Sequence, residues 1–339
     1  MAEWGNRPAA TRAVARPAPA IIVLVGATLA MLVWTLNGDE WAGDVAVGLQ
    51  ISWPAAVAGM VLLGLTVVHF VFAAMALRSV SGRKLTMHST AYAQLAAAAT
   101  NRIIPNGIGG AGVNLRYLLR AGLHPGAAAS ALATLAVVGG LTDAAYASAV
   151  ASAGPAVGVT GAAAEVRALT AHRLGAGAHP ATWLLFAAVL ALIAVTVVRR
   201  RRASPAAFAS AVRQACTHAA MLARLPRRLV TVLVASAMTT AAMSAGFVVA
   251  VRVWGHAPTP LPAGALIAVY LLAATVGGAT PLPSFVGVTE AALIGGLILS
   301  GYSSGSAITS VVVFRLITYW LPLPVGIAAA RHLRSRALL

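Results

Sequence analysis

Long runs of apolar residues recur between residues 20 and 327, and they constrain the fold of this chain more than any other feature. About 20 apolar residues cross a bilayer as a helix, and in lipid only helices and closed barrels satisfy their backbone hydrogen bonds. Strands of a membrane barrel alternate apolar with polar residues, and these runs do not alternate, which argues against a barrel. Since 60% of the residues are hydrophobic and the mean hydropathy is +0.86, we predict an all-α, polytopic helical membrane protein.

Full-length spans are predicted at about 20–37, 54–77, 126–152, 181–198, 229–253 and 306–330. Two further regions, 89–122 and 263–301, each hold an apolar segment, a Pro-Gly break and a second apolar segment. The helices after the breaks, 106–120 and 284–300, would reach roughly 22–26 Å, short of the ~30 Å hydrocarbon core. We therefore expect about eight spans, including two broken or re-entrant helical hairpins.

The net charge of +17 does not point to nucleic acid, because most of the 24 basic residues lie at the ends of spans. The clusters are Arg7, Arg12 and Arg16; Arg78, Arg83 and Lys84; 199–202 with Arg213, Arg224, Arg227 and Arg228; and Arg331, Arg334 and Arg336. By the positive-inside rule these ends face the cytoplasm, and the acidic loop 37–44 faces outside. We predict a bacterial-type plasma-membrane protein with cytoplasmic tails at 1–19 and 331–339 and one transmembrane domain at 20–330.

The two broken regions match each other in composition and in position. Pro105 and Pro283 are each followed four residues later by a glycine. Two predicted spans precede each region and one follows it, but the first region is entered from the cytoplasm and the second from outside. The halves, about 20–153 and 181–330 with a basic linker at 199–228, are therefore predicted to form an inverted repeat, as in many transporters. Chance similarity between helical hairpins is the alternative.

Charged residues within the predicted membrane segments are Arg102, Asp143, Glu290 and Arg315. Such a charge costs roughly 2.5–3.5 kcal/mol on insertion scales, and it usually faces a cavity or a partner. We predict that these side chains handle a substrate. The alternative is internal ion pairing that only packs helices, for example Asp143 with Arg315 or Glu290 with Arg102.

The breaks themselves offer anion sites. Asn106 and Ser284 directly follow prolines, and both residue types cap helix N-termini well. A helix start inside the membrane presents free N–H groups to a phosphate or carboxylate, and nearby glycines let a headgroup approach the backbone. The predicted substrate-binding residues are Arg102, Pro105, Asn106, Gly107, Gly109, Arg116, Asp143, Pro283, Ser284, Gly287, Glu290, Arg315 and Tyr319.

No catalytic residue, metal site or cofactor is predicted. The eight histidines show no ligand spacing, and Cys216 is the one cysteine. The glycine pattern at 107–112 follows no strand, which argues against a dinucleotide site. His69 lies mid-span and is predicted to be packed or hydrogen-bonded.

Two segments, TNRIIPNGIGGAGVNLRYLLRAG and TPLPSFVGVTEAALIGGLILSG followed by VVVFRLITYWLPLPVG, resemble the lysylphosphatidylglycerol synthase transmembrane family. The matching positions are Pro105, Gly109, Arg116 and Gly122, then Pro283, Gly287, Glu290, Arg315, Tyr319, Pro322 and Gly326. The resemblance implies a lipid-handling membrane protein. Members with an aminoacyltransferase domain make aminoacylated phosphatidylglycerol, and their membrane part is implicated in flipping it. Because this sequence ends soon after its last predicted span, we expect a stand-alone membrane domain.

We predict a flippase that moves an anionic or aminoacylated phospholipid, or an isoprenoid-linked lipid, between leaflets. Arg102 and Arg315 would hold the headgroup, and Glu290 would gate the site or carry a proton. Expected partners are membrane lipids with anionic headgroups and a lipid-synthesising enzyme, with no nucleic acid; the oligomeric state stays open. Two alternatives remain, a polyprenyl-phosphate-dependent glycosyltransferase that uses the acidic residues of loop 37–44 and a non-transporting scaffold for a lipid-modifying enzyme.

Overall fold

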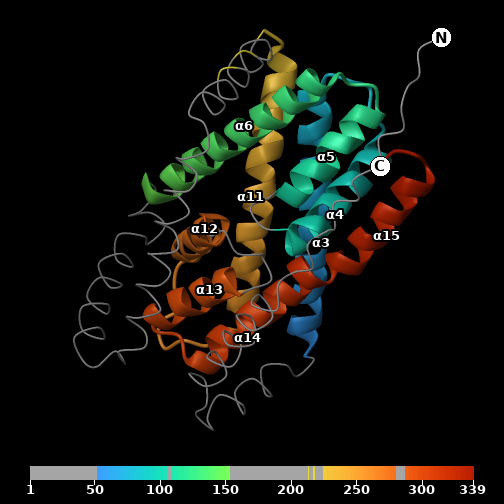
Figure 1. Cartoon of the computed structure of the whole chain (residues 1–339). Coiled ribbons are helices and arrows are strands. Elements are labelled where there is room, and N and C mark those ends of the chain that lie inside the picture. Colours follow the sequence, from blue (N-terminus) through green and yellow to red (C-terminus); the bar gives the residue numbers. More distant parts are fainter. Residues whose placement is uncertain (1–51, 105–107, 153–212, 214–216, 218–223, 280–286) are drawn as a thin grey trace, which may run out of the picture. The chain divides into compact units, whose positions relative to one another are not determined.

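The computed structural model describes residues 52–104, 108–152, 213, 217, 224–279 and 287–339. The chain divides into two compact units, Met1–Gly38 and Asp39–Leu339, and all described residues belong to the second. These residues form helices and connecting turns, which confirms the predicted all-α class (Figure 1). The predicted spans 20–37 and 181–198 lie outside the described residues.

The first group of helices is α3 (Trp53–Ser81), α4 (Met87–Ile103), α5 (Ile108–Arg120) and α6 (Pro125–Ser152). Local sequence explains where α3 begins and ends. The Ser52 hydroxyl caps its start by accepting a 3.4 Å hydrogen bond from the Ala55 N–H, and a proline occupies the first turn. Gly82 ends it with a φ of 68°, a conformation that glycine adopts readily.

The second group is α11 (Pro226–Trp254), α12 (Ala263–Ala279), α13 (Val288–Leu299), α14 (Ser304–Arg315), the π-helix η2 (Leu316–Trp320) and α15 (Pro322–Ser335). In the described part of the chain, four helices are long and apolar enough to cross a membrane. They are Trp53–Ser81, Pro125–Val150, Pro226–Trp254 and Ser304–Ser335, the last of which continues through α14, η2 and α15. These four coincide with the predicted spans 54–77, 126–152, 229–253 and 306–330, to within two residues at the end of the second.

Helices of the two groups match in length and in order. The first helices, α3 and α11, have 29 residues each, and the second, α4 and α12, have 17 each. The third, α5 and α13, have 13 and 12 residues and are followed by Gly122 and Gly301, with φ of 84° and 92°. At each of these two turns the N–H of the glycine donates a 3.0 Å hydrogen bond to the carbonyl three residues earlier. The N–H of the following residue donates a 3.1 Å hydrogen bond to the carbonyl five residues earlier. Both short helices therefore end in a Schellman motif.

The helices α3 and α11 pack along each other in antiparallel orientation (Figure 1). Gly82, just after the end of α3, lies against Arg228, near the start of α11; a Cβ on that glycine would be 3.1 Å from Arg228 Nη1. Toward the other end, a Cβ on Gly246 of α11 would be 3.3 Å from Leu62 Cδ2 of α3. The first helices of the two groups thus run in opposite directions.

The predicted start of the second short helix was wrong. Residues 284–300 were expected to be helical, but α13 begins at Val288. Its N-cap is Gly287, whose φ of 81° is left-handed, and a right-handed helix cannot run through that conformation. Ser284, the expected cap, lies outside the described residues.

A buried apolar core joins α3, α4, α5, α6, α11 and α15 at the end where α3 passes into α4. Leu77, Tyr117 and Leu333 are among its members. The Tyr117 hydroxyl lies 3.0 Å from the hydroxyls of Ser89 and Thr90, so its one buried polar group is satisfied. The hydroxyl contacts fix α5 against the start of α4.

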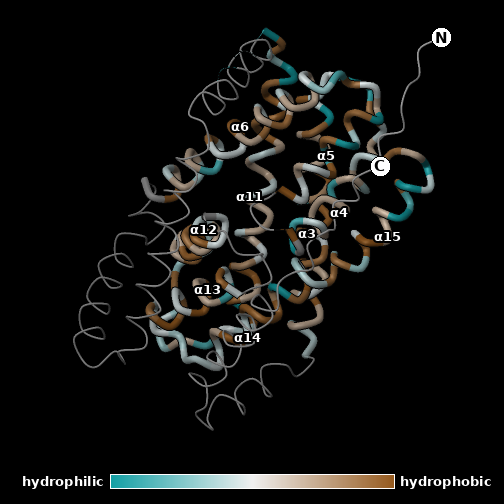
Figure 2. The backbone as a smooth tube through the Cα atoms, in the orientation of Figure 1, coloured by the Kyte–Doolittle hydropathy of each residue, from teal (hydrophilic) through white to brown (hydrophobic). Residues whose placement is uncertain are grey.

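Basic residues of separate clusters meet at this same end of the second unit. Arg83 donates a 2.9 Å hydrogen bond from Nη2 to the Gly122 carbonyl, and Arg228 lies beside Gly82. Hydrophilic segments gather around the α3–α4 connection and the end of α15 (Figure 2). The structure therefore brings together basic residues that are more than a hundred positions apart in the sequence.

Candidate functional site

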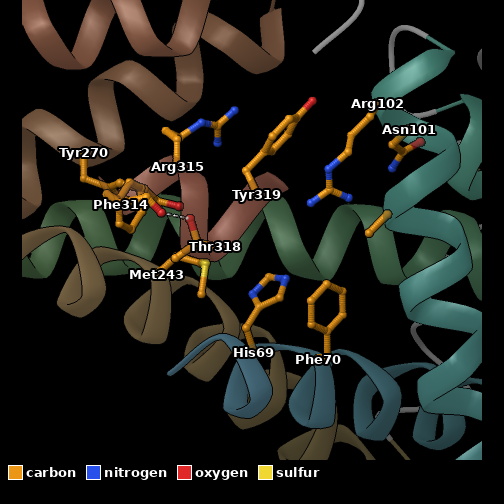
Figure 3. Close-up of a pocket in the computed structure, with 11 residues that line it drawn as sticks. His69, Phe70, Asn101, Arg102, Met243, Tyr270, Phe314, Arg315, Thr318 and Tyr319 are labelled. Atoms are coloured by element: carbon orange, nitrogen blue, oxygen red, sulfur yellow. Dashed lines mark hydrogen bonds between the residues drawn. The ribbon is translucent and has the colours of Figure 1, made fainter. Parts of the chain in front are cut away.

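A cavity of about 230 Å³ is lined by residues from the middle of α3 and of α11. Figure 3 shows the side chains that line it. Its lining includes His69, the seventeenth of the 29 residues of α3, and Met243, the eighteenth of the 29 residues of α11. Since both helices are long enough to span a membrane, their centres fall near the middle of the hydrocarbon layer. The lining residues are His69, Phe70, Ala98, Asn101, Arg102, Met243, Tyr270, Phe314, Arg315, Thr318 and Tyr319.

An aromatic cluster holds one side of this cavity. Phe247 of α11, Tyr270 of α12 and Phe314 of α14 have ring centroids 5.5–6.1 Å apart, two of the three pairs in edge-to-face geometry. Such pairs stabilise packing beyond the area that they bury. The cluster joins three helices and so fixes the position of Arg315, the residue that follows Phe314.

Tyr319 lies on the π-helix η2. The Leu321 N–H donates to the Leu316 carbonyl, five residues back, at 2.8 Å. Pro322 follows, and because proline has no N–H and clashes with the carbonyl four residues before it, it disfavours a regular α-turn here. The wider turn directs Tyr319 into the cavity, and π-turns are frequent at functional sites (Figure 3).

Two arginines contact the ring of Tyr319. The guanidinium carbon of Arg102 lies 4.2 Å from the ring centroid and that of Arg315 lies 3.9 Å from it. In the close-up the tyrosine stands between them (Figure 3). Cation–π attraction of roughly 0.5–2 kcal/mol each offsets part of the repulsion between the two charges.

The two arginines differ in how their charge is balanced. Arg315 Nε donates to Glu290 Oε1 at 2.5 Å, with side chains 14% and 21% exposed. This is the one ion pair among the described residues. Arg102 is 6% exposed, has no carboxylate partner there, and its Nε has no hydrogen-bond partner in the described part of the chain. Because an unpaired buried charge is costly, an anion that entered this cavity would stabilise Arg102.

The ion pair also links two helices. Glu290 lies in the first turn of α13 and Arg315 in the last turn of α14. Only one carboxylate oxygen of Glu290 is bonded, while Oε2 is buried without a hydrogen-bond partner among the described residues. An anion that bound Arg315 would compete with Glu290 and so loosen the contact between α13 and α14.

A second cavity of about 230 Å³ adjoins the first, since the two share His69, Phe70, Ala98 and Asn101. It extends toward α5, where its lining adds Ala73, Gln94, Ala97, Gly110, Ala111 and Asn114. The Gln94 Nε2 donates to Asn114 Oδ1 at 3.2 Å. The Gly110 N–H donates to Asn101 Oδ1 at 2.5 Å. The polar side chains that line this second cavity are therefore the amides of Gln94, Asn101 and Asn114 and the ring of His69.

The structure brings together four of the predicted substrate-binding residues. Arg102, Arg315 and Tyr319 line the first cavity, and Glu290 pairs with Arg315. Both ion pairs weighed from the sequence, Asp143 with Arg315 and Glu290 with Arg102, were wrong. Glu290 pairs with Arg315, and Asp143 accepts a 2.5 Å hydrogen bond from the Thr240 hydroxyl. That contact lies on an exposed part of α6.

Other predicted residues lie elsewhere. Arg116 and Asp143 are exposed and line neither cavity. Gly109 is buried against the backbone of Thr100, where a Cβ would be 2.7 Å from the carbonyl oxygen. Its place is in the packing of α5 on α4, and not at the wall of a cavity. Gly287 caps α13 and also lines neither cavity.

Several predictions fall outside the described residues. These are Pro105, Asn106, Gly107, Pro283 and Ser284 of the predicted site, the acidic loop 37–44, and Cys216.

Sequence reasoning missed the neutral polar lining. Gln94, Asn101 and Asn114 were not singled out, although Gln94 and Asn101 are seven residues apart on one helix in an alanine-rich stretch. That spacing places both on one face, which was the available signal. His69 was expected to be hydrogen-bonded, and its Nδ1 lies 3.2 Å from the Thr239 carbonyl oxygen. It also lines both cavities, which the sequence did not indicate.

Comparison with known protein families gives a match over most of the chain. The family model described as "Lysylphosphatidylglycerol synthase TM region" matches residues 18–326. No curated protein matches the chain.

Proposed function

Since that match covers most of its length, the chain belongs to the lysylphosphatidylglycerol synthase transmembrane family, and we propose that it moves an anionic lipid between the leaflets of a membrane. One observation carries this proposal. Arg102 is almost fully buried, lacks a carboxylate partner among the described residues, and faces a cavity at the mid-level of α3 and α11. A cation held there without its counter-ion fits a phosphate that enters and leaves.

The arrangement of helices supports transport. Transporters built from inverted repeats place the substrate near the middle of the bilayer, between discontinuous helices. Here the two groups of helices match in length and order, and their first helices, α3 and α11, run antiparallel. We propose that the groups are the two halves of an inverted repeat, with α4–α5 and α12–α13 as its broken hairpins.

We propose a transport cycle that is based on the contacts around Tyr319. A phosphate binds Arg102 first, because Arg102 has no carboxylate to displace. It then competes with Glu290 for Arg315, through charge-assisted hydrogen bonds of similar strength. Releasing Glu290 frees α13 from α14 and opens the cavity on one side. Re-formation of the ion pair expels the phosphate and resets the site.

Basic residues support a proposed orientation in the membrane. Arg83 and Arg228 lie at one end of the described helices, together with the basic end of α15. In cell membranes such ends face the cytoplasm. We propose that this end is cytoplasmic, and that the protein lies in the plasma membrane with a lipid-synthesising enzyme as a partner that supplies its substrate.

The test is exchange of fluorescent lipids between leaflets of proteoliposomes. The wild-type protein is expected to speed exchange of fluorescent phosphatidylglycerol but not of fluorescent phosphatidylcholine. Arg102→Gln should abolish this acceleration, whereas Arg252→Gln should keep it, because Arg252 is exposed in the last turn of α11. Equal exchange in Arg102→Gln and wild type would refute the site. No exchange of either lipid by wild type would refute transport of these phospholipids.

A further inference from the structure

We propose that His69 binds a proton whenever an anion occupies the first cavity, so that each anion crosses the membrane together with one proton. The proton site is the Nε2 atom of the imidazole. This inference rests on the proposed function, because it names the ion that is coupled to transport through the same site. It makes the protein a proton–anion symporter, whose activity responds to a pH gradient.

A backbone carbonyl fixes the tautomer of His69. The Nδ1 atom of the ring lies 3.2 Å from the Thr239 carbonyl oxygen. A carbonyl oxygen can only accept a hydrogen bond, so Nδ1 carries the proton of the neutral ring and donates in this contact. The other nitrogen, Nε2, then has a lone pair that can take a second proton. No hydrogen bond to Nε2 occurs among the described residues.

The imidazole reaches the site from the centre of α3. His69 lines both cavities, and it is the seventeenth of the 29 residues of α3. In the close-up its ring points from α3 toward the side on which Arg102 and Tyr319 lie (Figure 3). An edge-to-face contact with Phe70, with 5.2 Å between ring centroids, supports this orientation. A proton on Nε2 would therefore lie near the middle of the membrane, where alternating access exposes it to each side in turn.

The charged and titratable groups around His69 come from six helices. They are Arg102 of α4, Tyr270 of α12, Arg315 of α14 and Tyr319 of η2, which line the same cavity; Glu290 of α13, which pairs with Arg315; and Asp143 and Tyr146 of α6, which hydrogen-bond to Thr240 and Ser244 of α11. Helix α11 itself adds no charge at this level, since residues 229–251 include no Asp, Glu, Lys, Arg or His. The cavity wall thus carries two guanidinium groups, and one of them has a carboxylate partner.

These charges make proton binding depend on the anion. Without an anion, an imidazolium would add a second unbalanced positive charge beside Arg102, and like charges repel strongly in a low-dielectric site. A bound monoanion neutralises Arg102, and a proton on His69 then restores the charge that the empty site had. The protonated ring can also donate from Nε2 to the anion, and hydrogen bonds between charged groups are stronger than neutral ones. Proton and anion therefore bind together and leave together.

Glu290 is less suited to carry this proton. It lines neither cavity, and its carboxylate is bound to Arg315. Carboxylates ordinarily titrate well below neutral pH, whereas an imidazole gains and loses a proton between about pH 5 and 8.

The proton is exchanged with water. On the acidic side Nε2 takes a proton from a hydronium ion, which forms an N–H bond and leaves a water molecule. On the other side, the departure of the anion restores the repulsion from Arg102, and the imidazolium returns the proton to water. No electron is transferred, and Nδ1 keeps its own proton throughout.

The first test measures the protons taken up when the purified full-length protein in detergent binds dihexanoyl phosphatidylglycerol. A pH-indicator dye in weakly buffered solution should report up to about one proton per lipid bound, and the affinity should fall up to about ten-fold for each unit of rising pH. Both effects should disappear in His69→Gln, because the glutamine amide does not titrate but can still donate to the Thr239 carbonyl.

His88→Gln is the matched control, the same chemical change at an exposed position of α4, and it should behave as wild type. Glu290→Gln should keep the proton uptake, because the proton is on His69. Thermal unfolding of each variant shows that it is folded.

The second test needs no variant. In proteoliposomes with a pH gradient and no membrane potential, wild type should move fluorescent phosphatidylglycerol toward the leaflet on the alkaline side, up to about ten-fold per pH unit. A monoanion and a proton together carry no net charge, so a potassium diffusion potential of about 60 mV should leave the distribution unchanged. An anion that crossed alone would instead respond about ten-fold to that potential and not at all to the pH gradient.

Several results would overturn the inference. They are lipid binding without proton uptake in wild type or in Glu290→Gln, proton uptake that persists in a folded His69→Gln variant, and a lipid distribution that follows the potential instead of the pH gradient. Leaflet exchange together with any of these results leaves the proposed transport standing. No exchange by wild type at any pH would refute transport, and the inference with it.

Discussion

Exchanging Arg102 for methionine is expected to stabilise the protein while it abolishes function. Arg102 has a buried Nε without a hydrogen-bond partner among the described residues, and a buried unsatisfied donor costs about 1–3 kcal/mol. The variant removes that cost but loses the contact with the Tyr319 ring at 4.2 Å, worth about 1 kcal/mol. The net gain is about 1 kcal/mol, which corresponds to an unfolding temperature about 2–4 °C higher.

Arg315→Met is the matched control, because it makes the same chemical change on the other side of the same ring. It leaves the Glu290 carboxylate without its cation. Removing one partner of a fully buried ion pair costs about 3–5 kcal/mol, and the 14% and 21% exposure of this pair lowers that to about 1–3 kcal/mol. The two variants should therefore shift the unfolding temperature in opposite directions.

Both shifts can be measured by tryptophan fluorescence during heating of the purified protein in detergent, alongside leaflet exchange of phosphatidylglycerol. Added dihexanoyl phosphatidylglycerol should raise the unfolding temperature of wild type but not of Arg102→Met, since a ligand stabilises only the protein that binds it. A less stable Arg102→Met variant that still exchanges lipid would show that Arg102 is a packing residue and that the reasoning is wrong.

Three further variants test other contacts. Glu290→Gln removes the competitor for Arg315, so binding of dihexanoyl phosphatidylglycerol should tighten several-fold while leaflet exchange slows; faster exchange would contradict the proposed cycle. Gly326→Ala places a Cβ 2.3 Å from the Leu95 carbonyl oxygen and should lower the free energy of unfolding by about 1–3 kcal/mol. The control, Gly295→Ala, places its Cβ where no atom lies within 4 Å, so it should cost nothing. Equal unfolding temperatures of the two variants would contradict the tight packing of α15 on α4. Tyr117→Phe removes the hydroxyl contacts to α4 and should cost about 1 kcal/mol in the same heating experiment, and a variant as stable as wild type would show that these hydrogen bonds contribute nothing.

Much of the fold could be predicted from the sequence, because a chain in lipid can satisfy its backbone hydrogen bonds only as helices or as a closed barrel. An apolar run of sufficient length must be helical in a bilayer, so the spans at 54–77, 126–152, 229–253 and 306–330 could be placed without knowing what they contact. Prolines and glycines marked where α4 and α12 end. The exact start of α13 could not be placed, since the φ of Gly287 decides it and a glycine permits either sign.

Within the candidate site, the sequence identified residues but not their partners. Arg102 and Arg315 stood out because charges are costly in an apolar segment, and a cost of that kind can be read from composition alone. Tyr319 stood out because it matches the pattern of the family that the sequence resembles. Which charge meets which depends on how helices rotate and cross. The π-turn at η2 adds a residue to one turn. The side chains that follow it are therefore rotated by roughly 100° around the helix axis.

The sequence by itself therefore determined the class of molecule, the positions of its membrane helices and the presence of buried charge. Only the tertiary structure decided that Glu290 pairs with Arg315, that Arg102 has no carboxylate partner among the described residues, and that Gln94 meets Asn114. The physical reason is that helix formation and membrane insertion depend on each segment's own composition. Pairing between helices depends on contacts between residues that the sequence leaves far apart.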